Sequence, residues 1–173
     1  MTTREQEPLE TIAGYLADDH RRLDALLRSA LTEPRVDPLL YDEFRAGLLR
    51  HIGMEEKILM PAAQRANNGT PLPVAARLRL DHGALAALLM LVPTPAITSM
   101  IQAILMEHNH LEERQGGAYA LCEQLTTAEA QSVLTRLRSA PRVAVIPPSS
   151  HPNVLHAARR AVTRAGYAWS DEP

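Results

Sequence analysis

The chain has 173 residues, a length that suits one domain or one domain with a short appendage. Hydrophobic residues make up 46% of it, enough for a substantial core, whereas aromatic residues make up only 3%. Because strand-rich proteins rely on aromatic and β-branched residues, this composition argues against an all-β fold. The single cysteine excludes an intramolecular disulfide and a cysteine metal cluster. The formal net charge of −2 argues against nucleic acid as a partner.

Four segments with the spacing of amphipathic helices follow one another along the chain. They span residues 8–31, 38–67, 71–92 and 95–125, and apolar residues recur in each at every third or fourth position. Short links between them predict an all-α fold, an up-down-up-down four-helix bundle. Asp37 precedes Pro38 and is expected to cap the helix that follows, and Thr94-Pro95 is expected to open the fourth segment. Pro61 is expected to kink the second segment, and Gly116-Gly117 to weaken the fourth.

The remaining residues, 126–173, are expected to form an extension that packs on a bundle made by residues 1–125. Thr126 to Glu129 has the pattern of a capping box, which predicts one more helix. Four prolines between positions 141 and 152 predict an extended connection, and residues 153–165 predict a short, Arg-rich last helix. Because the bundle is acidic and the extension basic, we expect this Arg/Pro-rich tail to pack against the bundle.

The N-terminal residues contain no apolar signal segment. Residues 83–106 carry no charge and are numerous enough to span a bilayer, but Pro93 and Pro95 interrupt them. We therefore expect a cytoplasmic chain with no membrane partner. A homodimer stays an alternative to a monomer.

Six polar residues interrupt the apolar stripes at positions that face the expected core. They are His20, His51, Glu55, His82, His108 and Glu112. A buried, ionised carboxylate without a partner is strongly unfavourable, and no lysine or arginine lies on these stripes, so a bound cation is the simplest compensating charge. In both His-x-x-x-Glu pairs, the two residues share one helix face. Imidazole with carboxylate suits iron, manganese or zinc, and such ligands build dinuclear sites in bundle cores.

These polar positions form an internal repeat. The sequence around Asp19-His20 matches that around Asp81-His82, and His51-x-x-x-Glu55-Glu56 matches His108-x-x-x-Glu112-Glu113. Two helical hairpins related by a pseudo-twofold axis would therefore supply one histidine and then one His-Glu pair each. Glu56 and Glu113 are expected to be surface charges. Asp19 and Asp81 are also expected to face solvent, with the alternative that they orient the ligand histidines that follow them.

The order and spacing of these residues resemble those of the hemerythrin-like, HHE cation-binding family, over about residues 8–125. The resemblance implies two non-haem iron ions with an oxo or hydroxo bridge. Glu55 and Glu112 would be bridging carboxylates, and the four histidines would be terminal ligands. Zinc or manganese are the alternative metals.

A small gas or oxidant is the partner that this resemblance implies: the protein would bind or sense dioxygen, peroxide or nitric oxide. The residues four before and four after His82 are Leu78 and Ala86, which lack the second histidine of oxygen-carrying hemerythrins. One alternative is a di-iron enzyme that breaks down peroxide, or that reduces nitric oxide or delivers iron in iron–sulfur repair. Another alternative is a non-catalytic helical interaction module.

Overall fold

The computed structural model describes residues 10–32 and 36–171. They form helices joined by turns and one extended connection, without a strand, which confirms the predicted all-α fold class. The helix opening predicted at Pro8 lies outside the described residues. The α-helices are α1 (Ile12–Ala30), α2 (Pro38–Met54), α3 (Met60–Ala66), α4 (Ala75–Leu88), α5 (Pro95–Glu113), α6 (Ala118–Leu125), α7 (Ala130–Arg138) and α8 (Pro152–Arg164).

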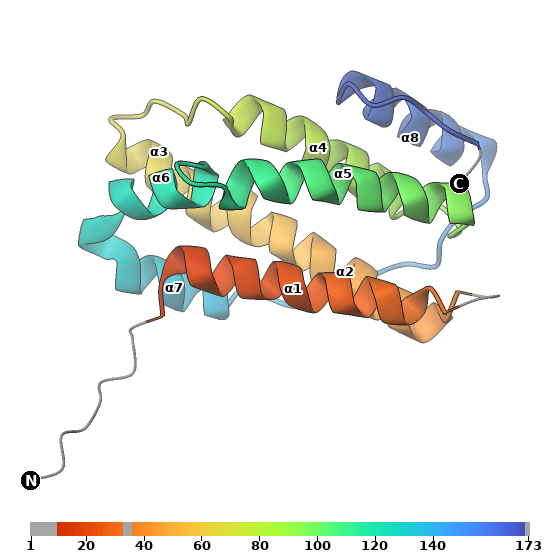
Figure 1. Ribbon diagram of the computed structural model, residues 1–173, viewed down its shortest axis with the longest axis horizontal. Helices are drawn as coiled ribbons and strands as arrows, with labels where there is room; N and C mark the ends of the chain where they lie inside the picture. The colour runs from red at the N-terminus through yellow and green to blue at the C-terminus, as the bar shows by residue number, and fades with distance from the viewer. Residues whose placement is uncertain (1–9, 33–35, 172–173) are drawn as a thin grey trace, which may run out of the picture.

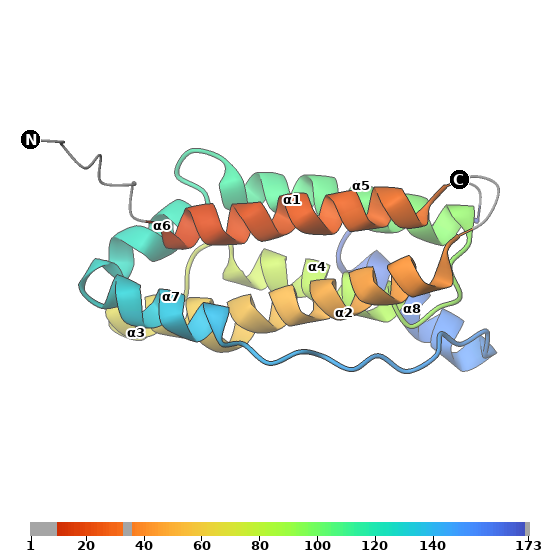
Figure 2. The same ribbon diagram turned by 90° about the horizontal axis from the view of Figure 1, so that it is seen from below.

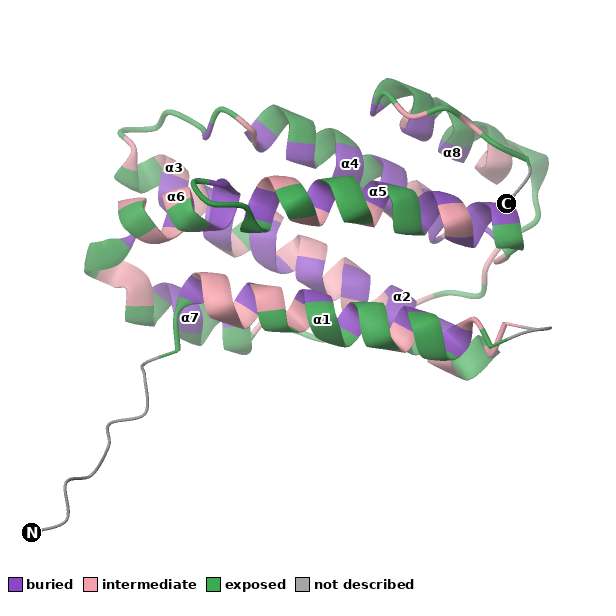
Figure 3. Ribbon diagram, in the orientation of Figure 1, coloured by how far each residue is buried: buried purple, intermediate pink, exposed green. Residues whose placement is uncertain are grey.

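Four long helices lie lengthwise beside one another (Figures 1 and 2). In chain order α1, α2, α4 and α5 each run opposite to the one before. Helices α6 and α7 lie at one end of this group, while α8 packs on the outside of α4. Buried residues face inward from all four long helices (Figure 3).

Two apolar clusters fill the interior and leave a polar band between them. On α1, Leu16 belongs to one cluster and Leu23 to the other, with His20 between them. On α4, His82 likewise separates Leu78 from Leu85. Because each fully buried leucine contributes about 1.5–3 kcal/mol to stability, the two clusters hold the polar band in place from both sides.

Residues 83–106, the uncharged stretch of the sequence, do not form one continuous helix. Helix α4 ends at Leu88 and α5 begins at Pro95, so residues 83–106 belong to two helices joined by a turn. In the described part of the chain, no helix combines the length and the apolar character needed to cross a bilayer.

The helix cap predicted at Asp37 is confirmed, and Thr94 caps the helix predicted to open at Thr94-Pro95. The Asp37 carboxylate accepts hydrogen bonds from the backbone N–H groups two and three residues further on, at 2.9 and 3.1 Å. The Thr94 hydroxyl accepts one from the N–H three residues further on, at 3.3 Å. Both caps precede a proline in the first helical position, where a missing N–H removes no helical hydrogen bond.

The capping box predicted at Thr126 to Glu129 is wrong. The Thr126 hydroxyl donates to the Cys122 carbonyl at 2.8 Å, so it closes α6 instead of opening the next helix. A short 3₁₀ turn, Thr127–Glu129, follows, and α7 begins at Ala130 without a side-chain cap. The Cys122 carbonyl, in the last turn of α6, competed for the hydroxyl that the sequence pattern assigned to α7.

The interruption expected near Pro61 is a π-helical turn, Glu55–Leu59, that joins α2 to α3. In this turn the Met60 N–H bonds to the Glu55 carbonyl, five residues earlier. Pro61 is then the second residue of α3, near the start of a helix, where proline is tolerated. Such π-turns insert one extra residue and occur often at functional sites. This one begins at a predicted metal ligand.

A tight turn, residues 114–117, separates α5 from α6 at the place where Gly116-Gly117 was expected to weaken the helix. Gly116 has a φ of +70°, a conformation that favours glycine. A Cβ atom on Gly117 would lie only 2.6 Å from the Glu112 carbonyl oxygen and 2.7 Å from that of Arg114. The turn therefore requires glycine at this position to direct α6 back toward the bundle centre.

We expect Gly117→Ala to lower the free energy of unfolding by about 1–3 kcal/mol, because the backbone must move to admit the methyl group. Gly53→Ala is the matched control. A Cβ at Gly53 meets nothing within 4 Å, and alanine in a helix interior adds about 0.5–1 kcal/mol of stability. Urea unfolding of both metal-free variants measures the difference, and a similar change in both would contradict the steric argument.

The C-terminal residues return along the bundle and are held by arginines of α2. After α7, an extended segment runs back past α2 to α8 (Figure 2). Arg50 donates to the backbone carbonyls of Ala140, Leu137 and Arg138. Arg45, which is buried, donates to those of Leu89 and Ile146. Arg50 thus anchors the extension where α7 ends, and Arg45 anchors it at Ile146, within the extended segment.

Candidate metal centre

The six predicted ligands meet in the polar band, and each side chain is at most 5% exposed. Their imidazole and carboxylate atoms form two groups of four, and within each group these atoms lie within 4.8 Å of one another. We name the groups after their histidines. The His20–His51 group contains His20, His51, Glu55 and Glu112, and the His82–His108 group contains His82, His108, Glu55 and Glu112.

The two glutamates belong to both groups because each directs one oxygen to either side. Glu55 Oε1 lies 3.2 Å from His51 Nε2, while Glu55 Oε2 lies 3.0 Å from His82 Nε2. Glu112 Oε2 lies 3.4 Å from His20 Nε2, while Glu112 Oε1 lies 3.2 Å from His108 Nε2. Two carboxylates placed in this way can bridge a pair of cations.

Two of these carboxylate oxygens are buried without a hydrogen bond from any described residue. They are Glu55 Oε2 and Glu112 Oε1, and both face the His82–His108 group. A buried acceptor without a donor is unfavourable, whereas a cation uses the same lone pairs directly. The donor set of imidazole nitrogens and carboxylate oxygens also suits a transition metal, so the residues present fit such an ion.

A second carboxylate lies beside the outer nitrogen of each histidine. Asp19 lies 2.9 Å from His51 Nδ1, and Asp81 lies 3.5 Å from His108 Nδ1. Glu56 lies 2.7 Å from His82 Nδ1, and Glu113 lies 2.5 Å from His20 Nδ1. A carboxylate hydrogen-bonded to Nδ1, as at His20, His51 and His82, fixes the ring orientation and leaves Nε2 directed toward the centre, as is usual for metal-binding histidines. The contact between Asp81 and His108 is longer and is not a hydrogen bond.

Solvent exposure, the outcome expected for Asp19 and Asp81, is therefore wrong, and their contacts favour the alternative in which they orient histidines. Glu113 is exposed as expected but also contacts His20. Asp81 is completely buried, and the Asp19 side chain is only 10% exposed. Glu56 and Glu113 are more exposed, at 24% and 37%, yet their carboxylates still reach histidines on the adjacent helices. The available signal was the repeat itself, in which each acid directly precedes or follows a predicted ligand.

We expect Asp19→Asn to weaken metal binding by about 10–100-fold, because His51 loses the carboxylate that orients it and raises its basicity. Asp18→Asn is the control, since the Asp18 side chain is 64% exposed and pairs only with Arg21 among the described residues. Competition with a fluorescent chelator would compare the affinities. Equal affinities in the two variants would exclude an orienting role for Asp19.

Tyr119, from α6, places its hydroxyl among the atoms of the His20–His51 group. The hydroxyl donates to Glu55 Oε1 at 2.5 Å, and lies 3.1 Å from Glu112 Oε2. It lies 3.0 Å from His20 Nε2 and 3.2 Å from His51 Nε2. Burial and the two glutamates raise the pKa of Tyr119. The sequence placed this tyrosine on the inward stripe but did not single it out, because an aromatic residue there is most often part of an apolar core.

Protons and negative charges are closely balanced in the centre. Burial opposes protonation of His51 and His108, but adjacent carboxylates raise the pKa of each to about 10. Burial and the charge of Glu55 raise the pKa of Glu112. The pKa of Glu55 is lowered in spite of burial, because His51 and His82 stabilise its ionised form. A cation that binds here takes over the role of these protons and displaces them.

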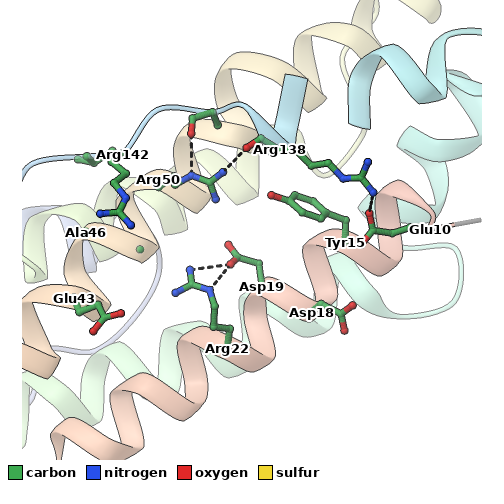
Figure 4. Close-up of a pocket in the computed structure, with 13 residues that line it drawn as sticks. Glu10, Tyr15, Asp18, Asp19, Arg22, Glu43, Ala46, Arg50, Arg138 and Arg142 are labelled. Atoms are coloured by element: carbon green, nitrogen blue, oxygen red, sulfur yellow. Dashed lines mark hydrogen bonds and ion pairs between the residues drawn. The ribbon is translucent and has the colours of Figure 1, made fainter. Parts of the chain in front are cut away.

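A pocket of about 850 Å³ reaches the outer side of the His20–His51 group (Figure 4). It lies between α1, α2 and the segment after α7, and Asp19 is part of its wall. One Asp19 oxygen binds Arg22 at 2.8 Å and the other contacts His51. The equivalent acid of the repeat, Asp81, is buried and pairs with Arg77 at 3.2 Å. The two equivalent aspartates therefore differ in their surroundings: Asp19 borders the pocket, whereas Asp81 is completely buried.

The fold and these contacts define a class of protein: an all-helical chain with buried histidines and glutamates in two groups able to hold metal. The family model of the hemerythrin HHE cation binding domain matches residues 11–115. Because this match covers more than half of the chain, the protein belongs to that family, and the resemblance noted in the sequence is confirmed. No curated protein and no solved structure matches the chain.

Proposed function

We propose that the chain binds two iron ions and that this pair binds a small oxidant or gas, such as dioxygen, peroxide or nitric oxide. His20 and His51 would hold one ion, and His82 and His108 the other. Glu55 and Glu112 would bridge them. Family membership supports cation binding, and the iron pair is the finer proposal.

One observation carries the proposal more than any other: two glutamates are each shared between two pairs of histidines. Each carboxylate offers one oxygen to either pair, at 3.0–3.4 Å from the imidazole nitrogens. A single ion in the His20–His51 group would leave Glu55 Oε2 and Glu112 Oε1 without a hydrogen bond, and a single ion in the His82–His108 group would leave two histidines and two carboxylate oxygens unused. Two ions engage all of them.

An iron pair, when bound, would supply one-electron redox chemistry toward such small molecules. The chain itself provides the surroundings. Asp19, Glu56 and Glu113 hold the outer nitrogens of His51, His82 and His20. The apolar clusters on both sides exclude bulk water from the centre. Without metal, the Tyr119 hydroxyl donates its proton to Glu55 Oε1 at 2.5 Å, inside the same band.

Iron loading under air tests the proposal. We expect about two iron ions per chain and a near-ultraviolet absorption typical of oxygen-bridged ferric iron in the full-length protein. The matched control is the double variant Glu55→Gln, Glu112→Gln, which should retain neither iron nor absorption. Two zinc or manganese ions bound in preference to iron would reject the iron assignment. Wild-type protein without bound metal would reject the whole proposal.

A further inference from the structure

Tyr119 breaks the internal symmetry of the centre. Tyr119 lies seven positions after Glu112, whereas the residue seven positions after Glu55 is Ala62. Both are buried, with 2% and 0% of their surface exposed. One half of the centre therefore contains a phenolic oxygen where the equivalent helix of the other half has only a methyl group.

The position of the Tyr119 oxygen coincides with the place that a metal ion would need. It lies 2.5–3.2 Å from the four atoms of the His20–His51 group: Glu55 Oε1, Glu112 Oε2, His20 Nε2 and His51 Nε2. Metal–nitrogen and metal–oxygen bonds in proteins are about 2.0–2.2 Å long. An ion that binds these four atoms must lie among them, so the phenolic oxygen has to move away from this point.

After this displacement, few hydrogen-bond partners remain for the Tyr119 hydroxyl. All of its hydrogen bonds in the described part of the chain go to these four groups, which the ion would now engage. The ring is packed in an apolar cluster with Leu16, Met54 and Leu59. A buried hydroxyl without a partner is unfavourable, whereas a small shift would bring its oxygen to bonding distance from the ion itself.

From this geometry we infer that Tyr119 is a ligand of the metal ion held by His20 and His51, binding through its phenolic oxygen. The phenolic proton is released to solvent as the ion binds. The two metal ions are then chemically different, because the His82–His108 group has no equivalent ligand on α3. This inference rests on the proposed metal centre and specifies its ligand set.

Spectroscopy of the iron-loaded, full-length protein tests the inference. The protein is loaded with ferrous iron without oxygen and then oxidised with ferricyanide, which takes one electron from each ion. A ferric phenolate gives a visible charge-transfer band, and excitation in that band enhances the ring vibrations in the resonance Raman spectrum. We expect both signals in wild-type protein and their complete loss in Tyr119→Phe. Tyr41→Phe is the matched control, since Tyr41 is equally buried but lies in the other apolar cluster.

The outcomes separate this inference from the proposed function. Two iron ions per chain without phenolate signals would overturn the role of Tyr119 and leave the iron pair standing. One ion per chain without phenolate signals would also overturn it, because the tyrosine would then block the His20–His51 group. One ion with phenolate signals would support the ligand and reject the pair. The wild-type spectrum decides the question even if Tyr119→Phe fails to fold.

Discussion

Replacement of Glu55 by glutamine is expected to abolish binding of both metal ions rather than one. Glu55 contributes one oxygen to each group, so the variant lacks a charged ligand on both sides at once. The glutamine amide keeps the size of the side chain but replaces one oxygen by an N–H₂ group, which cannot coordinate. Metal analysis after dialysis against a weak chelator measures the loss.

Two further variants calibrate this result. Glu56→Gln should weaken affinity by about 10–100-fold without abolishing binding, because Glu56 acts through His82. Glu107→Gln, on the exposed face of α5, should leave metal content unchanged. If Glu55→Gln kept both ions, the shared carboxylates would not be bridging ligands, and the arrangement proposed for the centre would be wrong.

Removal of metal is expected to lower the melting temperature by roughly 10 °C. Ligands that bind only the folded state stabilise it by about 4 kcal/mol at a thousandfold excess over Kd. For a chain of this size each kcal/mol shifts the melting temperature by roughly 2–4 °C. Calorimetry with and without a strong chelator measures the shift. Glu55→Gln is the control, because a chelator should not change the melting temperature of a variant that binds no metal.

The metal-free protein should also lose stability as the pH rises. Adjacent carboxylates raise the pKa of His51 and His108 to about 10 in the folded chain, above the ordinary histidine value of 6.5. The folded state therefore retains protons that the unfolded state releases. Their stabilising effect is complete below about pH 6.5 and disappears as the pH rises toward about 10. Melting curves between pH 7 and pH 10 should shift downward without metal, and a constant or rising melting temperature would contradict this electrostatic account.

Much of the fold could be predicted because each helix carries its own signals. Asp37 and Thr94 cap their helices as the dipeptides with proline indicated. The π-turn could not be predicted, because residue types near Pro61 indicate an interruption but not its hydrogen-bond register. The capping box at Thr126 misled because the preceding helix offered its hydroxyl an alternative acceptor, the Cys122 carbonyl.

The six inward polar residues could be selected from helical period alone, and the structure brings them together. Their role as ligands stays a prediction. The helical periodicity could not reveal the carboxylates that lie beside the histidine Nδ1 atoms. A residue next to a ligand in the sequence points about 100° away from it around the helix. Whether that direction is solvent or another helix depends on packing. Glu56 reaches His82 only because α4 lies beside α2's π-turn.

Each helical hairpin contributes one glutamate to the histidine pair of the other hairpin, and this sharing has a consequence for how the bundle opens. Helices α1 and α2 with the π-turn supply three residues of the His20–His51 group, and Glu112 of α5 supplies the fourth. The His82–His108 group has the reverse composition, with Glu55 as its single contribution from the first hairpin. Two bound ions would thus fasten the hairpins together reciprocally. Release of metal and separation of the hairpins become one kinetic event, so the rate of metal loss would report how often the bundle opens.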